Sequence, residues 1–431
     1  MKEGAVITAV VILALILGAT AMSLTYYETQ TLRSELTKQS QNLKAISEGL
    51  QEVKAELNTL KSSVSDVRSR VGSIGSDVAS LQSRIESLAS ELSNLKAGES
   101  SLQDEVASLK EEVKLAKYPM TLTDALGRTV TLYRRPEKIV SVVPSFTEIL
   151  FLIGAGKNVV GVDQFSNYPP VVNQLKKNGS LKVVGGFSTI NIEALLKLKP
   201  DLVIMTGGVQ DRYVKELSDM GVPVIVLKSG SISDIFSDIM ILGALTDHEG
   251  EALKLVEWMR NTIIQTHEAV VNYLNKTGGK EVKVYYELFP DYWTMGRNSY
   301  ITDMISLAGG ENIFGNITKY YFVASPEAVI AANPDVIIIN YNYGQFGSPD
   351  TLVHRIASRS GWGNVTAVRE GRIYVMQGAV EDIMVRPGPR AALGVAILAR
   401  IFYSHAFGLE SVPEVINETV LQSWGLTLPK G

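Results

Sequence analysis

The sequence contains no cysteine and only four histidines among its 431 residues. Without cysteine the chain cannot form disulfide bonds, thiolate metal sites, a cysteine nucleophile or a lipid-modified N-terminal cysteine. The histidines are never closer together than 19 residues, so no pair has the spacing of two metal ligands on one helix. We therefore expect no directly bound transition metal.

Motifs of catalysis and of nucleic-acid binding are absent as well. There is neither a G-x-S-x-G elbow nor a G-x-x-x-x-G-K-S/T phosphate loop in the sequence. The 41 Lys and Arg residues face 45 Asp and Glu residues, which gives a net charge of −4 and no surplus for binding phosphates. We expect no catalytic residues, no enzyme activity, no cofactor and no nucleic-acid partner.

The first 27 residues are almost free of charge. No charged residue occurs from Gly4 to Tyr27, and residues 5–24 provide about the 20 apolar residues that a membrane-spanning helix needs. Cleavage as a signal peptide is an alternative, because Ala19 and Ala21 form an A-x-A pattern. Trimming after Gly4 would leave the helix in place. Because no cysteine can carry a lipid, we expect a single-pass anchor in the cell membrane, with the rest of the chain outside the cell.

Residues 28–117 repeat every seven positions. From Leu43 to Ala116, 20 of the 22 a and d positions are Val, Ile or Leu; Glu99 is one exception and Ala116 the other. So long a heptad repeat indicates a parallel coiled coil of about 110 Å between copies of the chain. The mixture of residues at a and d leaves dimer and trimer open. Gly98, beside Glu99, is the expected position of a bend.

From residue 120 onward, short β-branched runs alternate with helical stretches, which predicts parallel sheets covered by helices. Two short sequence motifs occur twice. Residues 156–161 resemble residues 310–315, and Glu193 lies seven residues before the Pro-Asp pair 200–201, as Glu327 lies seven residues before the pair 334–335. Between the two copies, residues 249–276 predict one helix of roughly 40 Å. We therefore expect an α/β fold of two Rossmann-like lobes joined by one long helix, after a transmembrane helix and a coiled coil. The predicted parts are an anchor (1–27), a stalk (28–117), a first lobe (120–246), a connecting helix (247–277) and a second lobe (278–431).

Aromatic and arginine residues gather in the predicted loops that follow strands. Such loops usually face the ligand in open α/β folds, and aromatic rings on facing loops can hold a large, flat, partly apolar ligand. An arginine there can bind carboxylate or carbonyl oxygens. The candidate ligand-binding residues are Phe146, Tyr168, Phe187, Tyr292, Trp293, Tyr321, Tyr343 and Arg386, within a wider set that includes Phe165, Arg212, Tyr320, Tyr341 and Phe346.

The chain from residue 120 onward resembles a known family. The matching segments are 123–128 (TDALGR), 135–141 (RPEKIVS), 144–148 (PSFTE), 163–170, 185–187 (GGF), 191–201, 299–314, 325–327 (SPE), Trp362, 367–368 (AV), 371–374 (GRIY) and 386–390 (RPGPR). In this order they resemble the cobalamin- and ferric-siderophore-binding proteins of ABC importers, over residues 120 to about 405. The resemblance implies two lobes bridged by a helix, a ligand in the cleft between them and delivery to a membrane permease.

The resemblance also implies roles for single residues. Glu193 and Glu327 occupy the positions at which the family pairs with arginines of the permease. Asn191 and Ser325 also suit helix N-caps, so a carboxylate in the first turn is favourable in any case. Tyr168 and Tyr321 match aromatic positions of cobalamin binders.

The ligand class stays open among cobalamin, a ferric siderophore and haem. A structural rival is a cell-surface stalk whose lobes no longer serve import. The stalk departs from the family, and five N-x-S/T sequons fit an exported chain. Together with the anchor and the missing lipid cysteine, they suggest an archaeal cell surface.

Overall fold

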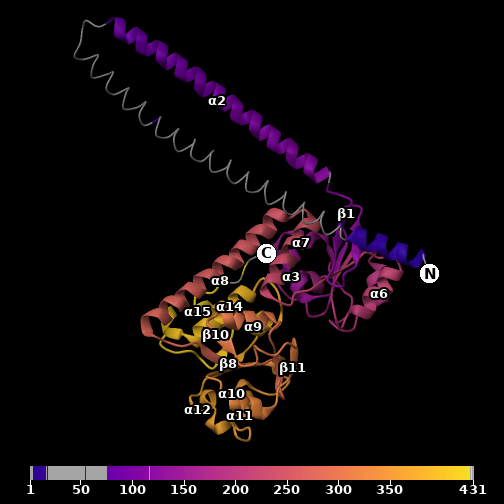
Figure 1. Ribbon diagram of the computed structural model, residues 1–431, viewed down its shortest axis with the longest axis vertical. Coiled ribbons are helices and arrows are strands. Elements are labelled where there is room, and N and C mark those ends of the chain that lie inside the picture. The colour runs from indigo at the N-terminus through magenta and orange to yellow at the C-terminus, as the bar shows by residue number, and fades with distance from the viewer. Residues whose placement is uncertain are drawn as a thin grey trace. The chain divides into compact units, whose positions relative to one another are not determined.

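A computed structural model describes residues 3–15, 17, 54, 75–115, 117–427 and 429 (Figure 1). The chain divides into two units, Met1–Leu122 and Thr123–Gly431. Much of the predicted anchor and the first part of the heptad repeat lie outside the described residues.

In the first unit, residues 3–15 are helical and a 41-residue helix, α2, spans Gly75–Leu115. Figure 1 shows α2 as a straight rod, and it continues through Gly98, where a bend was expected. Its heptad residues point outward: Ile85, Leu88, Leu92, Leu95 and Leu102 are 41 to 56% exposed. None of the described helices has both the length and the hydrophobicity to cross a bilayer.

The first lobe of the second unit contains a five-stranded parallel sheet with the order β5-β4-β3-β6-β7. Apart from the short edge strand β5, its strands are largely buried and rich in Val and Ile, as expected for a sheet covered on both faces. The strands are β3 (Ile139–Ser141), β4 (Val159–Val162), β5 (Lys182–Val183), β6 (Leu202–Thr206) and β7 (Val224–Leu227). The helices are α3 (Pro144–Leu152), α4 (Val171–Lys177), α5 (Ile192–Lys197), α6 (Asp211–Asp219) and α7 (Ile232–Thr246). The short strands β1 (Met120–Thr123) and β2 (Thr129–Leu132) precede them.

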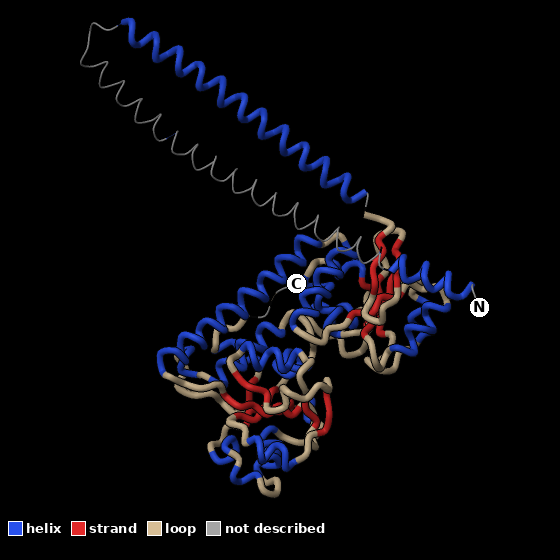
Figure 2. Tube along the Cα trace, viewed as in Figure 1, coloured by secondary structure: helices blue, strands red, loops and turns tan. Residues whose placement is uncertain are grey.

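The second lobe repeats this plan in a parallel sheet of order β10-β8-β12-β13-β14. Its strands are β8 (Val282–Glu287), β10 (Gly310–Asn312), β12 (Val336–Asn340), β13 (Ile373–Met376) and β14 (Val415–Ile416), with the antiparallel pair β9 (Trp293–Met295) and β11 (Tyr321–Val323) beside it. Its helices are α9 (Tyr300–Leu307), α10 (Pro326–Ala332), α11 (Pro349–Ala357), α12 (Thr366–Arg369), α13 (Ala379–Val385), α14 (Ala391–Phe402) and α15 (Glu418–Ser423). Figure 2 shows helices flanking the strands of both lobes. The predicted α/β fold with two lobes of parallel sheets is confirmed.

A 29-residue helix, α8 (Glu249–Thr277), runs between the two lobes and covers the stretch expected to form one long helix. It ends at Gly278, whose φ of 67° lies in the left-handed region that glycine adopts without strain. At 1.5 Å per residue α8 is about 43 Å long.

The repeated Pro-Asp phrase has the same structural role in both lobes. Asp201 donates its backbone N–H to the carbonyl of Lys138 (3.0 Å), and its carboxylate accepts the N–H of Lys138 (2.9 Å). Asp335 makes the same two contacts with Lys283, each at 2.8 Å. Each aspartate therefore ties the start of one central strand to the start of its neighbour, which explains why the phrase recurs.

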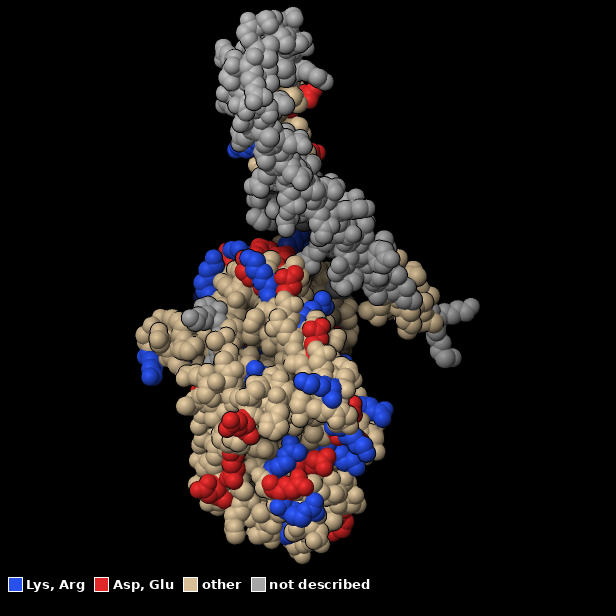
Figure 3. All heavy atoms as spheres, turned by 90° about the vertical axis from the view of Figure 1, so that its left-hand side faces the viewer, with Lys and Arg blue, Asp and Glu red and all other residues tan. Residues whose placement is uncertain are grey.

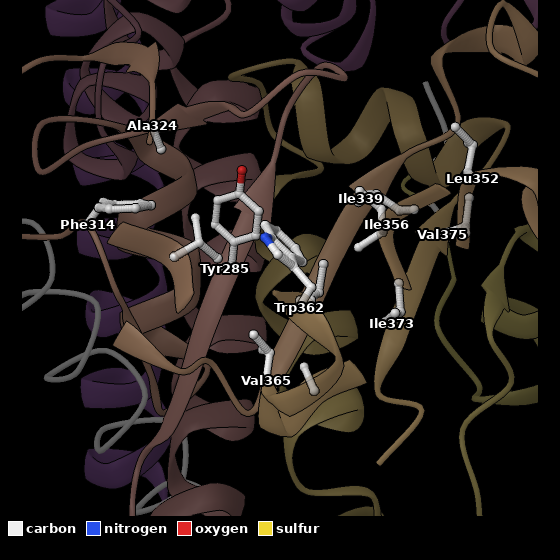
Figure 4. Close-up of a cluster of buried hydrophobic side chains, with 13 residues drawn as sticks. Tyr285, Phe314, Ala324, Ile339, Leu352, Ile356, Trp362, Val365, Ile373 and Val375 are labelled. Atoms are coloured by element: carbon white, nitrogen blue, oxygen red, sulfur yellow. The ribbon is translucent and has the colours of Figure 1, made fainter. Parts of the chain in front are cut away.

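The core of the second lobe is built around Trp362 and Tyr285, both fully buried (Figure 4). Their rings meet edge to face, with centroids 5.9 Å apart. Such aromatic pairs add stability beyond the area they bury. Tyr292 and Tyr341, from the loops that follow β8 and β12, pack against this core.

Candidate ligand-binding cleft

A cleft of about 1440 Å³ lies between the two lobes. On the first lobe its walls are the segments that follow β3, β4, β6 and β7, and on the second lobe those that follow β8, β12 and β13. These segments leave the carboxyl ends of parallel strands, where open α/β sheets bind their ligands. The fold thus brings the binding edges of both sheets to one cavity.

Exposed aromatic side chains line the cleft from both lobes. Phe165 and Phe187 come from the first lobe, and Phe289, Trp293, Tyr321 and Phe346 from the second, each 36 to 54% exposed. Trp293 and Tyr321 lie on the paired strands β9 and β11, with ring centroids 5.7 Å apart. Large apolar side chains left in contact with water in a concave site are typical of a surface that a ligand covers.

Local structure explains how Phe187 reaches the cleft. The preceding Gly185 has a φ of 126°, and a Cβ there would lie 2.3 Å from the carbonyl oxygen of Thr189. Buried Gln210 then donates to the carbonyl of Phe187 at 2.7 Å. The turn therefore requires glycine, and the glutamine side chain holds it in place.

Five of the eight candidate ligand-binding residues line the cleft, namely Phe146, Phe187, Trp293, Tyr321 and Arg386. Phe146 is buried in the wall, in the first turn of α3. Arg386 is nearly buried and pairs with Asp382 at 2.7 Å. Phe165, Tyr320 and Phe346 of the wider set line the cleft too.

Two of the eight, Tyr168 and Tyr292, are not among the residues that line the cleft. The ring of Tyr168 covers the guanidinium of Arg390 at 3.9 Å, and burial raises the pKa of its phenol to about 12. Tyr292 packs on Trp362 and under the guanidinium of Arg359, 4.1 Å from its ring. Both rings cover buried arginines, which sequence spacing does not reveal.

Other members of the wider set also lie elsewhere. Arg212 stacks on Tyr213 at 4.5 Å, and Tyr341 packs against the core of the second lobe. The eighth candidate ligand-binding residue, Tyr343, belongs to the short 3-10 turn Asn342–Gly344, and its side chain lies outside the described part of the chain.

Charged side chains of both signs line the cleft. Of these, only Arg386 was among the candidates named from the sequence. Three are cationic (Lys228, Arg297 and Arg386) and four are carboxylates (Asp234, Asp291, Asp303 and Glu381). The cleft is therefore close to electrically balanced.

Two of these carboxylates, Asp234 and Asp303, lie near each other where the two lobes join. Asp303 of the second lobe accepts the backbone N–H of Ile232 in the first lobe at 2.9 Å. Asp234 forms a capping box with Ser231 at the start of α7. Burial raises the pKa of Asp303, and the nearby Asp234 raises it further. The S-x-x-D capping pattern is visible in the sequence, but it does not show that Asp234 faces the cleft.

A buried ion pair crosses between the lobes beside the cleft. Glu148 of α3 accepts from Nε of Arg390 at 3.0 Å and from Nη2 at 2.9 Å, and both side chains are at most 3% exposed. Nearby, Arg386 donates to Asn167 of the first lobe at 2.6 Å, and Asn167 donates to Asp382 at 2.9 Å. These charge-assisted contacts fix how the lobes meet.

The two glutamates assigned to permease docking are exposed, in the first turns of α5 and α10. The expected N-caps are present: Asn191 accepts from the N–H of Ala194 at 2.9 Å, and Ser325 accepts from that of Ala328 at 3.1 Å. Glu193 pairs with Lys197 at 2.7 Å in an exposed contact that contributes little to stability. Figure 3 shows a face of the molecule on which cationic and acidic side chains are interspersed.

Nothing in the described part of the chain forms a group of three or more His, Cys, Asp or Glu side chains able to hold a metal ion.

The sequence is similar to solute-binding proteins of ABC transporters. An uncharacterized ABC transporter substrate-binding lipoprotein of Bacillus subtilis, YvrC, is 29% identical over 298 residues, 68% of this chain and 88% of that protein. A cobalamin-binding protein of Halobacterium salinarum is 28% identical over 295 residues, 68% of this chain and 76% of that protein. Both relatives are binding proteins by name.

Solved structures agree in fold. A possible iron-binding periplasmic solute-binding protein from Staphylococcus epidermidis superposes with a TM-score of 0.53 at 29% identity, over 63% of this chain and all of that one. The periplasmic haem-binding protein RhuT from Roseiflexus gives a TM-score of 0.53 at 26% identity, over 63% of this chain and 99% of that one. The model of the periplasmic binding protein family matches residues 139–380, more than half of the chain. With its two parallel-sheet lobes and the cleft between them, this chain belongs to the periplasmic binding protein family, as a solute-binding protein of the ABC-transporter type.

Proposed function

We propose that this protein captures a metal-chelate ligand in the cleft and delivers it to an ABC permease, and that within this class the ligand is a cobalamin-type corrinoid. The observation that carries the proposal is a cavity of about 1440 Å³ with exposed aromatic rings on both walls. A large macrocycle covers such rings and removes their apolar surface from water.

The charges of the cleft favour a ligand without net negative charge. Three cations and four carboxylates line it, so the two propionates of haem would meet no surplus of positive charge. The rim of a corrinoid carries neutral amides, which can donate to carboxylates such as Asp234 and accept from cations such as Lys228.

Iron ligation adds to this preference. No histidine is among the described residues that line the cleft. Burial raises the pKa of two phenols there, Tyr300 and Tyr320, which disfavours an iron-binding phenolate at either of these two residues. A corrinoid that carries both axial ligands needs none from the protein. Similarity to the Halobacterium salinarum cobalamin-binding protein supports the same choice.

Delivery would use Glu193 and Glu327, one on each lobe. Both carboxylates are exposed and can be reached by arginines of a permease. Their position in corresponding first turns of α5 and α10 supports a paired docking role.

The anchor and the stalk are part of the proposal. Residues 5–24 would hold the chain in the membrane, since no cysteine can be lipidated as in the lipoprotein of Bacillus subtilis. The heptad stripe of α2, exposed in the single chain, would pack against the same stripe of further copies in a dimer or a trimer.

Calorimetry on the full chain with cyanocobalamin, haemin and ferrichrome tests the ligand. We expect cyanocobalamin to bind, and Trp293→Ala to weaken binding by about tenfold through loss of one stacked ring. Tyr133→Ala is the matched control, because Tyr133 is 79% exposed and lies outside the cleft lining. Failure of all three ligands to bind would reject the proposed class, and equal effects of the two variants would reject the aromatic cleft as the site.

The docking role is tested by Glu193→Ala combined with Glu327→Ala. We expect cells that carry this variant to lose uptake of the ligand while the purified variant keeps its affinity. The alternative, a structural surface stalk, predicts unchanged uptake in these cells and a disturbed surface layer when residues 43–113 are deleted.

A further inference from the structure

The hydroxyl of Ser145 is buried without a hydrogen-bond partner. Ser145 is 1% exposed, and its Oγ is one of two such side-chain atoms in the described part of the protein. Buried hydroxyls are nearly always satisfied, because an unpartnered one costs stability. Ser145 also belongs to the lining of the cleft, so a bound ligand is a candidate for the missing partner.

The same residue stands at an uncapped helix N-terminus. The N-cap position of the nine-residue helix α3 is Val143, which has no capping side chain, and Pro144 at the first helical position has no N–H. The first turn contains no acidic residue. The corresponding helix of the second lobe, α9, is capped by Ser299, which accepts the N–H of Thr302 at 3.2 Å.

The donors at this end of α3 therefore have no partner within the helix. The free N–H groups of Ser145 and Phe146 lie at the positive end of the helix dipole, beside the serine hydroxyl. Val143, Pro144, Ser145 and Phe146 all line the cleft, so this end of the helix is part of its wall.

The surrounding charges select the kind of oxygen. Glu381 also lines the cleft, and Glu148 lies one turn further along α3, paired with Arg390. Arg390 compensates the charge of Glu148, and Arg386 lines the cleft together with Glu381, so no surplus of positive charge favours an anionic group over a neutral carbonyl oxygen. The loop at Gly388 lies against Ser145, since a Cβ on Gly388 would be 3.2 Å from the Cβ of Ser145. Serine has three staggered rotamers, so its hydroxyl can turn from this loop to a ligand.

We propose that the N-terminus of α3 and the hydroxyl of Ser145 form a subsite that binds a carbonyl oxygen of the ligand, such as an amide carbonyl on the rim of a corrinoid. This inference rests on the proposed function, because it assigns one polar contact within the same cleft.

Ser145→Ala tests the subsite through two opposite effects. The full chain with this substitution should be as stable as the wild type or more stable without ligand, because an unsatisfied buried hydroxyl is removed. Its dissociation constant for cyanocobalamin should rise roughly fivefold to tenfold, the loss of one hydrogen bond. Ser237→Ala is the control, since this exposed serine of α7 bonds only the carbonyl of Ser233 at 3.1 Å.

The outcomes separate the two proposals. If cyanocobalamin binds the wild type and Ser145→Ala equally, the subsite is overturned and the proposed function stands. If haemin or ferrichrome binds in place of cyanocobalamin, the corrinoid is rejected and the two proteins are compared with that ligand, where equal dissociation constants overturn the subsite. If none of the three binds the wild type, both proposals are rejected.

Discussion

Replacing Arg390 by methionine should destabilise the two-lobed unit by several kcal/mol. Arg390 forms a forked ion pair with Glu148 at 2.9 to 3.0 Å, and both side chains are at most 3% exposed. Burial alone would lower the pKa of Arg390, but the Glu148 carboxylate outweighs it and holds that pKa above its usual value. The substitution leaves the carboxylate buried without its cation, a change that typically costs about 3–5 kcal/mol.

The effect can be measured as a melting temperature. For a unit of this size, 1 kcal/mol corresponds to about 2 °C, so we expect Arg390→Met to melt about 6–10 °C lower. The double variant Glu148→Gln with Arg390→Met should recover most of this loss, because no unpaired charge stays buried. Differential scanning calorimetry of the full chain at pH 7 resolves both differences.

Two results would refute this reasoning. The first is a decrease of less than about 2 °C in Arg390→Met, which would mean that water reaches Glu148 once the arginine is gone. The second is a double variant no more stable than the single one, which would assign the loss to the packing of Arg390 on Tyr168.

Three further predictions concern other parts of the chain. Burial raises the pKa of Asp238 to about 7. The free energy of unfolding should therefore fall by up to about 1.4 kcal/mol for each unit of pH as the pH rises from about 4 to about 7. Asp238→Asn should remove that slope in melting curves at pH 5 and pH 8, and an unchanged slope would contradict it. Arg359→Met leaves buried Glu287 without the cation that pairs with it at 2.6 Å. Urea unfolding should show a loss of about 3–5 kcal/mol in the free energy of unfolding, and adding Glu287→Gln should restore most of it. A double variant as unstable as the single variant would contradict the charge argument. Leu92→Asp on α2 should convert oligomers to monomers in light scattering without changing ligand affinity; a monomeric wild type would refute the coiled coil.

The fold was predictable because its signals are local and repeat along the chain. Short apolar runs fenced by Pro, Gly and Asp mark buried parallel strands, and the doubled Pro-Asp phrase marks two equivalent lobes. Asp201 and Asp335 repeat because each ties neighbouring strands together at the same point. The site was only partly predictable. Phe187 and Trp293 were identified as loop aromatics, but the same criterion also selected Tyr292, whose backbone φ of 71° accompanies a ring turned to the core.

The sequence by itself determined the absence of thiol chemistry, the heptad stripe and the two-lobed α/β plan, because each depends on composition or on a period along the chain. Only the tertiary structure decided which side chains share the cleft. Glu148 and Arg390 are 242 positions apart, and their pairing follows from how the two lobes meet. The unpartnered hydroxyl of Ser145 is likewise a tertiary property, because the residues that bury it come from elsewhere in the chain. Burial and pairing depend on neighbours brought together by folding, and no local pattern encodes them.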